Sequence, residues 1–349
     1  MIRTSAIVMS VLLFTASNGA ANHTKVYVAN QGSNTVTVID DQRVNAMVAA
    51  DAVGSTPAAA HAAVARQDFA VVTTIPVGSN PIAVGMSADG TLAYVANLNS
   101  NSLSVIDTEL DVVVATIAVG APRDVEATPD GRYLLVVNQS ANTVTVLDAS
   151  NYTVVMTIPV GNFPCAIAIA PDGSAAYVTN RLSNNVSIID LTTFQVTNVT
   201  VGTFACDVML SPDGRWAVVT NRLSGNITII ETGSKIAVAT VATGTNPQGV
   251  AFSPDGTRAY VTNAATTSVV DMNSFTVIDT ITDVTSGTCA VAATMDMNSG
   301  HEGHVYVASN TQSGRVNVID VGSHSVVATF MVGARPLGIG IRMWPWRMQ

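Results

Sequence analysis

The sequence predicts an all-β fold, a seven-bladed β-propeller built from four-stranded antiparallel blades. Three observations predict it. A short apolar motif ending in asparagine recurs along the chain, most of its copies are 41 or 42 residues apart, and Asp-Gly turns fall between them. A period in the low forties with strand-like units is typical of propeller blades. The 349 residues are therefore expected to form one closed assembly rather than several domains.

Seven copies of the motif can be read, of which Tyr177-Val178-Thr179-Asn180 is one. From Asn97 onward the terminal asparagines are spaced 41, 42, 41, 42 and 47 residues apart, and only the first interval, 67 residues, is out of line. We expect the tyrosine and valines to build the sheet and the asparagine to turn the chain. The other copies occupy residues 27–30, 94–97, 135–138, 218–221, 260–263 and 307–310.

The unit from Pro164 to Gly202 shows one blade whole. Its four expected strands are short, rich in valine and isoleucine, and cover residues 165–170, 175–180, 186–190 and 195–201. The breaks fall at Asp-Gly, Asn and Gly, where positive φ or local side-chain hydrogen bonding allows the chain to reverse. The turn of the sixth complete unit, around Asp296, is degenerate.

The two ends of the chain predict how the ring closes. The repeats begin near Lys25 on a second strand, and residues 336–341 match a first strand with no blade after it. One blade is therefore expected to combine both termini, which leaves no free sheet edge at the join. An alanine-rich stretch at residues 41–70 interrupts the first repeat. We expect a loop insertion, part helical or disordered, that either has no role or carries one through His61.

Composition restricts the class of function. The chain is 11% charged and 48% hydrophobic, yet no apolar run reaches the roughly 20 residues that cross a bilayer, so no membrane span is expected. The net charge is −9, and the clustered Lys and Arg that neutralise nucleic-acid phosphates are missing. We expect no nucleic-acid partner and a monomeric ring that binds a protein, a cell-surface polymer, a small ligand or a metal ion.

The N-terminal residues differ from the repeats. Arg3 precedes an apolar stretch at residues 6–14, and small residues at 19–21 offer a cleavage site. We interpret residues 1–21 as a secretory signal peptide, followed by the propeller over residues 22–349. The alternatives are a buried first strand or a membrane anchor. The interpretation predicts a secreted protein of the periplasm or cell surface.

Over residues 25–341, the repeated Pro-Asp-Gly, Tyr-Val-Thr-Asn and Val-Gly elements closely resemble the YVTN family of seven-bladed propellers. That family is known from surface-layer and secreted proteins of archaea and bacteria. The resemblance implies the fold but no single function, because similar propellers also carry lactonase or redox activities. The insertion at residues 41–70, the degenerate sixth turn and Trp216, displaced toward the tyrosine position of its blade, depart from the family pattern.

Candidate functional residues come from aligning the first strands, which line the channel of a propeller. The position after the recurring proline includes all three cysteines of the protein. The next position contributes Asp124 and Asp207, and Glu126 lies two residues after Asp124. Arg181 and Arg222 lie in loops between second and third strands, on the face of the ring where ligands of propellers usually bind. The seven residues at the aligned position are Ile82, Arg123, Cys165, Cys206, Gln248, Cys289 and Leu337.

The cysteines allow three interpretations. With nearby carboxylates, Cys165, Cys206 and Cys289 would bind a soft or borderline metal ion. Alternatively, cysteine fills space between tightly packed inner strands, or the first two form a disulfide. A second candidate metal site is the pair His301 and His304 in the degenerate turn, where the spacing suits a metal if the loop is helical. Beyond such a metal ion, no cofactor is indicated.

Two functions follow. The favoured one is a non-enzymatic scaffold that binds partners through loops at the channel mouth. The alternative is a propeller enzyme, either a lactonase-like hydrolase or a redox or metal-dependent oxidoreductase, with Asp124, Glu126 and Asp207 as catalytic candidates. An enzyme requires such groups to converge with shifted pKa values, so carboxylates buried apart in separate blade interfaces would exclude it in this form. The expected ligand contacts are Arg123, Asp124, Arg181, Asp207, Arg222 and Gln248.

Overall fold

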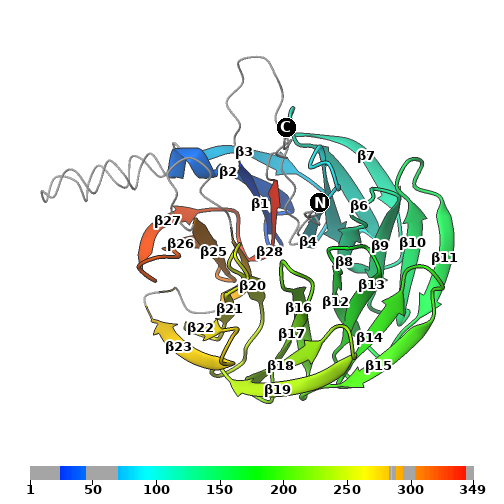
Figure 1. The fold of residues 1–349 in the computed structure, drawn as a ribbon. Helices are drawn as coiled ribbons and strands as arrows, with labels where there is room; N and C mark the ends of the chain where they lie inside the picture. Colours follow the sequence, from blue (N-terminus) through cyan, green and yellow to red (C-terminus); the bar gives the residue numbers. More distant parts are fainter. Residues whose placement is uncertain (1–23, 45–69, 283, 285–287, 294–302, 343–349) are drawn as a thin grey trace, which may run out of the picture.

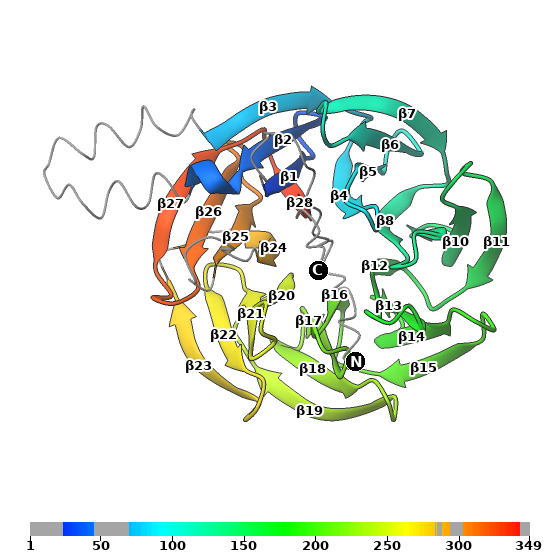
Figure 2. The ribbon, with the colours of Figure 1, turned by 45° about the horizontal axis from the view of Figure 1, so that its top comes forward.

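The chain forms a closed ring of seven four-stranded antiparallel sheets around a central channel (Figures 1 and 2). This computed structural model describes residues 24–44, 70–282, 284, 288–293 and 303–342. In each blade the first strand lies innermost and the fourth outermost. The predicted fold class is confirmed. Within the described ranges, no helix has the length and apolar character needed to cross a membrane.

The blades are numbered from the one that contains both chain ends. Blade 1 contains β28 (Pro336–Arg342), β1 (Lys25–Asn30), β2 (Thr35–Asp40) and β3 (Val71–Pro76). Blade 2 contains β4 (Pro81–Met86), β5 (Leu92–Asn97), β6 (Ser102–Asp107) and β7 (Val112–Ala118). Blade 3 contains β8 (Pro122–Ala127), β9 (Tyr133–Asn138), β10 (Thr143–Asp148) and β11 (Val154–Pro159). Blade 4 contains β12 (Pro164–Ile169), β13 (Ala175–Asn180), β14 (Asn185–Asp190) and β15 (Val196–Thr200).

The remaining blades follow the same plan. Blade 5 contains β16 (Ala205–Leu210), β17 (Trp216–Asn221), β18 (Asn226–Glu231) and β19 (Ile236–Ala242). Blade 6 contains β20 (Val250–Phe252), β21 (Arg258–Thr262), β22 (Thr267–Asp271) and β23 (Thr276–Ile281). Blade 7 contains β24 (Thr288–Ala293), β25 (His304–Ser309), β26 (Arg315–Asp320) and β27 (Val326–Met331).

The ring closes as predicted, because β28 pairs antiparallel with β1. The register places Ile341 opposite Val26 and Ile339 opposite Val28. Residues 41–44, at the start of the expected insertion, are helical. The rest of that insertion to residue 69, with His61, lies outside the described residues, as does the expected signal peptide.

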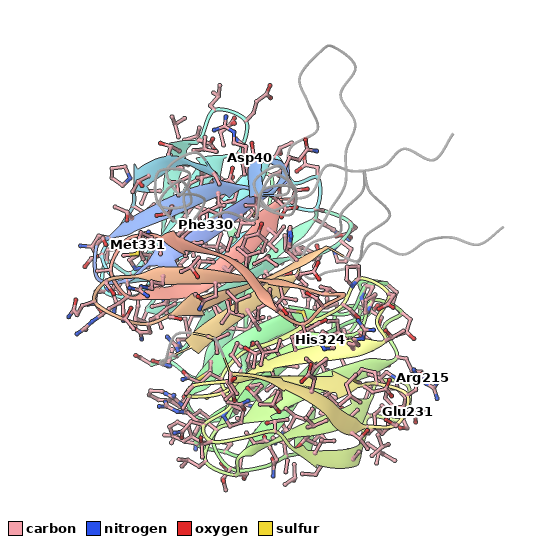
Figure 3. All side chains as sticks on the ribbon, turned by 90° about the vertical axis from the view of Figure 1, so that its left-hand side faces the viewer. Asp40, Arg215, Glu231, His324, Phe330 and Met331 are labelled. Atoms are coloured by element: carbon pink, nitrogen blue, oxygen red, sulfur yellow. The ribbon has the colours of Figure 1, made fainter. Side chains whose placement is uncertain are left out.

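The two middle strands of each blade form the core, because neighbouring blades cover both of their faces. All six positions of β13 are buried, whereas most of β7 is exposed on the rim. A strand covered on both faces is apolar throughout instead of alternating. In the edge-on view of Figure 3, Met331 lies on one side of the disc and His324, Arg215 and Glu231 on the other. We call the first side, with the loops between second and third strands, the mouth face, and the second the lower face.

The motif asparagine joins two strands instead of turning the chain, so our expectation for it was wrong. Asn180 is fully buried, and its amide donates to Asn185 Oδ1 and Ser187 Oγ on the next strand, both at 2.8 Å. The turn itself uses Asn184, whose φ of 52° lies in the left-handed region that asparagine tolerates. Asparagines 30, 97, 138, 221 and 263 make equivalent bonds to third strands.

The seventh copy of the motif is shifted by one residue from its predicted place. Ser309 pairs with Arg315 in the same way that Asn180 pairs with Asn185. The copy is therefore residues 306–309, with Tyr306 at the tyrosine position. Here the amide has moved to the third strand, because Asn317 Nδ2 lies 3.5 Å from the Ser309 hydroxyl.

Five of the motif asparagines also meet the glycine that ends the preceding blade, and Asn138 is the exception, because nothing lies within 4 Å of the Cβ position of Gly120. A Cβ atom on Gly161, after blade 3, would lie 2.6 Å from Cγ of Asn180 in blade 4. The same conflict recurs at four other blade junctions, including Gly333 against Asn30 at the closure of the ring. Only glycine lets the blade end approach the buried amide this closely. A Cβ atom on Gly78 or Gly202 would lie 2.7 Å from Cγ of Asn97 or Asn221, respectively. On Gly244 it would lie 2.9 Å from Cγ of Asn263.

We therefore predict that Gly161→Ala destabilises the protein by about 1 to 3 kcal/mol, because the new methyl group overlaps a side chain held by two hydrogen bonds. Gly120→Ala is the matched control, since nothing lies within 4 Å of the Cβ position there. Denaturant unfolding of both variants measures the difference. Equal stability of the two variants would contradict the role assigned to this contact.

Candidate functional site

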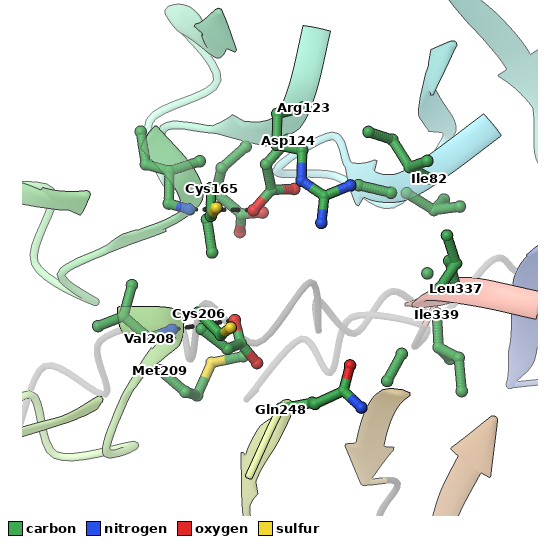
Figure 4. Close-up of a pocket in the computed structure, with 18 of the residues that line it drawn as sticks. Ile82, Arg123, Asp124, Cys165, Cys206, Val208, Met209, Gln248, Leu337 and Ile339 are labelled. Atoms are coloured by element: carbon green, nitrogen blue, oxygen red, sulfur yellow. Dashed lines mark hydrogen bonds between the residues drawn. The ribbon is translucent and has the colours of Figure 1, made fainter. Parts of the chain in front are cut away.

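The inner strands enclose a cavity of about 200 Å³ in the central channel. Its wall is polar on blades 3 to 6 and apolar on blades 7, 1 and 2. Figure 4 shows this division, with Arg123, Asp124, Cys165, Cys206 and Gln248 facing a wall formed by Ile82, Leu337 and Ile339.

Most of the residues selected from the sequence line this one cavity. The lining includes Arg123, Asp124, Glu126, Cys165, Arg181, Cys206, Asp207 and Gln248. Arg222 is not among the lining residues and instead lies beside Phe204, with its Cζ atom 5.9 Å from the ring centroid. Cys289 is on β24, but its side chain lies outside the described part of the chain.

Two carboxylates are held in place by irregularities in the inner strands. The pairing of β8 with β9 shifts between Pro122 and Asp124, and the pairing of β16 with β17 shifts between Ala205 and Val208. Such bulges re-aim side chains. Asp124 follows the first shift, and Asp207 lies within the second.

Each carboxylate connects its own blade to the next one. Asp124 Oδ2 accepts a hydrogen bond from the Ile167 backbone N–H of blade 4 at 3.0 Å, and its Oδ1 accepts from its neighbour Val125 at 2.8 Å. Asp207 repeats the arrangement toward blade 6, with Val250 N–H at 3.0 Å and Val208 N–H at 2.9 Å. The two side chains are therefore fixed relative to the backbone of four blades, Asp124 between blades 3 and 4 and Asp207 between blades 5 and 6.

Burial nevertheless raises the pKa of both carboxyl groups. It raises the pKa of Asp124 to about 6, although two backbone N–H donors and the charge of Arg123 act in the opposite direction. It raises the pKa of Asp207 to about 7, and the negative charge of Asp124 adds to the increase. Both side chains keep part of their surface open to the cavity. Asp124 and Asp207 therefore line one cavity with raised pKa values, while their hydrogen bonds span different blade junctions, between blades 3 and 4 and between blades 5 and 6. Their catalytic role stays a prediction.

Arg123 brings a positive charge to the same cavity. Its Nε atom is buried, and among the described residues its guanidinium group forms neither a hydrogen bond nor an ion pair. Its charge lowers the pKa of both Asp124 and Asp207 without direct pairing. The guanidinium group is therefore available to a ligand.

Arg181 covers the mouth side of the cavity and is held by aromatic rings. Its Cζ lies 4.0 Å from the ring centroid of Phe204 and 5.7 Å from that of Phe163, in cation–π geometry. Both phenylalanines adopt positive φ, 65° and 56°, which is rare for bulky residues. Side-chain oxygens of Asn184 and Asn142 accept their backbone N–H groups and hold this conformation.

Sequence reasoning missed the threonines that support the carboxylate positions. The Thr220 hydroxyl accepts from the Asp207 backbone N–H at 3.0 Å and donates to the Gln248 carbonyl of the next blade at 2.8 Å. Thr179 makes the equivalent pair of bonds to Ala166 and Cys206. The sequence did contain a signal for these hydrogen bonds. Thr179 and Thr220 occupy the third position of the motif, where blades 1 to 3 have alanine or valine.

Cys165 and Cys206 are both free thiols that line the cavity. Cys165 Sγ lies 3.6 Å from the Phe163 carbonyl, and Arg181 Nη2 lies 3.9 Å from Cys206 Sγ. Burial raises the pKa of the Cys206 thiol. In the described ranges, no three His, Cys, Asp or Glu side chains gather closely enough to hold a metal ion. A metal site that includes Cys289 stays a prediction.

The histidine pair of the degenerate turn is only partly described, because His301 lies outside the described residues. We expected His304 in a loop, but it is the first residue of β25 and is buried. Its Nδ1 atom lies 3.2 Å from Asp41 Oδ1, which also accepts a hydrogen bond from the Tyr306 hydroxyl. Packing of the blade 7 strand against the segment that follows β2 explains this burial.

Fold and site together define a seven-bladed propeller with a half-polar, half-apolar cavity in its channel. The sequence matches the family model described as "Lactonase, 7-bladed beta-propeller" over residues 14–157 and 150–237, which together cover well over half of the chain. The chain belongs to this family. The finer resemblance to YVTN repeat proteins of the surface-layer type stays a prediction.

Solved structures with the same fold are distant in sequence. Hydrazine synthase from Kuenenia stuttgartiensis is similar at a TM-score of 0.67 and 20% identity, covering 92% of this chain and 97% of that one. A functionally unknown protein from Desulfotomaculum acetoxidans DSM 771 is similar at a TM-score of 0.72 and 19% identity, covering 92% and 99%. At this identity the likeness shows the fold alone. No curated protein matches the sequence.

The raised pKa of Asp207 predicts how stability depends on pH. Because its folded pKa of about 7 lies above the ordinary aspartate value of 3.8, its contribution to stability is fully present below pH 3.8 and is lost progressively as pH rises to 7. Asp207→Asn removes this loss. Between pH 5 and pH 8 the variant should therefore gain about 2 kcal/mol relative to the unmodified protein.

Denaturant unfolding at the two pH values measures this gain. Asp148→Asn serves as the control, because hydrogen bonds from Ser150 lower the pKa of that exposed carboxylate and it stays ionised throughout this range. A pH dependence of Asp207→Asn that matches the unmodified protein would show that Asp207 titrates normally.

Proposed function

We propose that the protein binds a small cyclic ester in the channel cavity and hydrolyses it, as a hydrolase of lactonase type. The observation that carries this proposal is that Asp124 and Asp207, with raised pKa values, line the same cavity as the unpaired guanidinium group of Arg123. Membership of the lactonase propeller family supports it.

In the proposed reaction, the Asp207 carboxylate acts as general base. Its pKa of about 7 suits a group that must both accept and return a proton near neutral pH. Asp207 takes a proton from water while the water oxygen bonds to the carbonyl carbon, and Arg123 stabilises the resulting oxyanion. When the ring C–O bond breaks, the alkoxide takes the proton from the Asp207 carboxyl group. Asp124, with the lower pKa, remains mainly ionised.

The rest of the cavity restricts the substrate. The apolar wall formed by blades 7, 1 and 2 suits the hydrocarbon part of a ring and excludes water from that side. At about 200 Å³, the cavity is smaller than the roughly 300 to 1,000 Å³ of drug-sized ligand sites, so it favours a compact molecule. Residues 1–21 support the further proposal that this activity is secreted, to the periplasm or the cell surface.

Ring opening of γ-butyrolactone and δ-valerolactone, followed as acid release, tests the proposal. Asp207→Asn should lower kcat/KM at least about 100-fold, because a positioned general base contributes that much. Arg123→Met should have a similar effect through the lost oxyanion partner. Asp148→Asn should leave the rate unchanged. No ring opening above the buffer rate, or an Asp207→Asn variant of normal activity, would contradict the proposal.

A second candidate, the non-enzymatic binding scaffold, is favoured by exposed leucines on the mouth face. Leu182 is 60% exposed and Leu223 is 67% exposed, each directly after an arginine in the loop between second and third strands of successive blades. Together with the ordered Arg181, these loops present an apolar and cationic surface to a protein or cell-surface polymer.

The scaffold candidate predicts that the purified protein binds isolated cell envelopes of the producing organism. The double variant Leu182→Asp with Leu223→Asp should weaken this binding at least about tenfold, because it removes both apolar contacts. Leu110→Asp, at an equally exposed leucine on the lower face, is the control. Binding that the double variant leaves unchanged would argue against this surface.

A further inference from the structure

A repeated contact on the lower face ties each blade to the one before it. In blades 2 to 7, the fourth residue after the third strand has a positive φ and donates its backbone N–H to the last residue of that strand. In most blades its side chain packs on an aromatic residue of the preceding blade. The pairs are Tyr27 with Asp111, Tyr94 with Tyr152, Tyr133 with Phe194, Trp216 with Phe275 and Tyr260 with His324.

Blade 5 breaks this pattern, because Lys235 occupies the contact position. Lys235 has the same backbone conformation, with φ of 58°, but it makes no contact of this kind with Tyr177 of blade 4. A cavity of about 340 Å³ opens between the two blades instead. It lies on the lower face, away from the channel cavity, and shares no lining residue with it.

The phenol of Tyr177 lines this cavity. Tyr177 is 2% exposed, lines the cavity, and its hydroxyl forms no hydrogen bond within the described part of the chain. The hydroxyl of Tyr27, at the same position of blade 1, donates to Asp111 Oδ1 at 2.7 Å. Burial, with the charge of Asp172, raises the pKa of Tyr177 to about 12, so the group stays a donor.

Unpaired charges of both signs surround the phenol. Each of Asp172, Asp190 and Asp213 uses Oδ1 to hold its own turn, while Oδ2 makes no hydrogen bond to any residue that the structure describes. Lys235 forms no ion pair among the described residues, although its charge contributes to the lowered pKa of Asp190. The three carboxylates do not gather closely enough to hold a metal ion, as noted for all described residues.

We infer that this lower-face cavity is a binding site for a small zwitterion, a free amino acid. The separated carboxylates of Asp172 and Asp213 would receive its ammonium group, and Lys235 would receive its carboxylate. A simple cation would leave Lys235 unpaired, and a simple anion would meet three carboxylates. The Tyr177 hydroxyl would donate to the bound carboxylate, as the Tyr27 hydroxyl donates to the carboxylate of Asp111.

Isothermal titration with glycine, L-alanine and L-serine tests this site. At least one should bind saturably, and ethylammonium and acetate should each bind more weakly. Lys235→Met and Asp172→Asn should weaken binding at least about tenfold, because each removes one charge, and Tyr177→Phe should weaken it less. Asp130→Asn is the matched control, since that carboxylate holds the equivalent turn of blade 3 and does not line the cavity.

A further variant separates loss of the site from loss of the fold. Lys235→Asp should recreate the contact seen between Tyr27 and Asp111, closing the cavity. It should abolish amino acid binding without lowering the melting temperature. Absence of saturable binding by all three amino acids, equal affinity for ethylammonium, or undiminished binding by Lys235→Met would overturn the inference.

Discussion

The contact between a blade-ending glycine and a buried asparagine organises the ring. The side-chain amide of Asn180 donates hydrogen bonds to the third strand of its own blade. Its Cγ atom lies so close to Gly161 of the preceding blade that no Cβ atom would fit at that position. The contact recurs at the closing junction, between Gly333 and Asn30. Because the same short contact sets the spacing between most neighbouring blades, the inner strands present equivalent positions to the channel at one level.

Equivalent positions with different residues create the channel site. The ring supplies nearly the same backbone at each first strand, and substitution alone makes one side polar and the other apolar. Asp124 and Asp207 satisfy a backbone N–H of the following blade, so they are structural links as well as candidates for chemistry. That double use explains how carboxyl groups with raised pKa values remain in so compact a channel, since buried charge requires hydrogen-bond partners. A single substitution has a similar effect on the lower face. Residues equivalent to Lys235 contact an aromatic ring of the preceding blade, whereas a cavity separates Lys235 from the body of blade 4.

The repeat pattern of the sequence predicted those features of the ring that depend on backbone hydrogen bonding. The blade count, the closure by β28 and the bounds of β13 all follow from the repeat. The errors arose where one side chain replaces another. Asn180 was expected to turn the chain because asparagine often does, and the seventh copy was misaligned because serine and asparagine exchange places between Ser309 and Asn317. His304 was expected in a loop because the degenerate turn hides where β25 begins.

The sequence by itself determined the fold, the closure of the ring and the set of residues that face the channel. It did so because strand periodicity and turn residues act locally and repeat seven times. Only the tertiary structure decided which of those residues line the same cavity. The coupling of Asp124 to Asp207, the unpaired state of Arg123 and the open contact of Tyr177 with Lys235 depend on distances between different blades. Such distances, and the burial that shifts a pKa, arise only when the blades pack against each other.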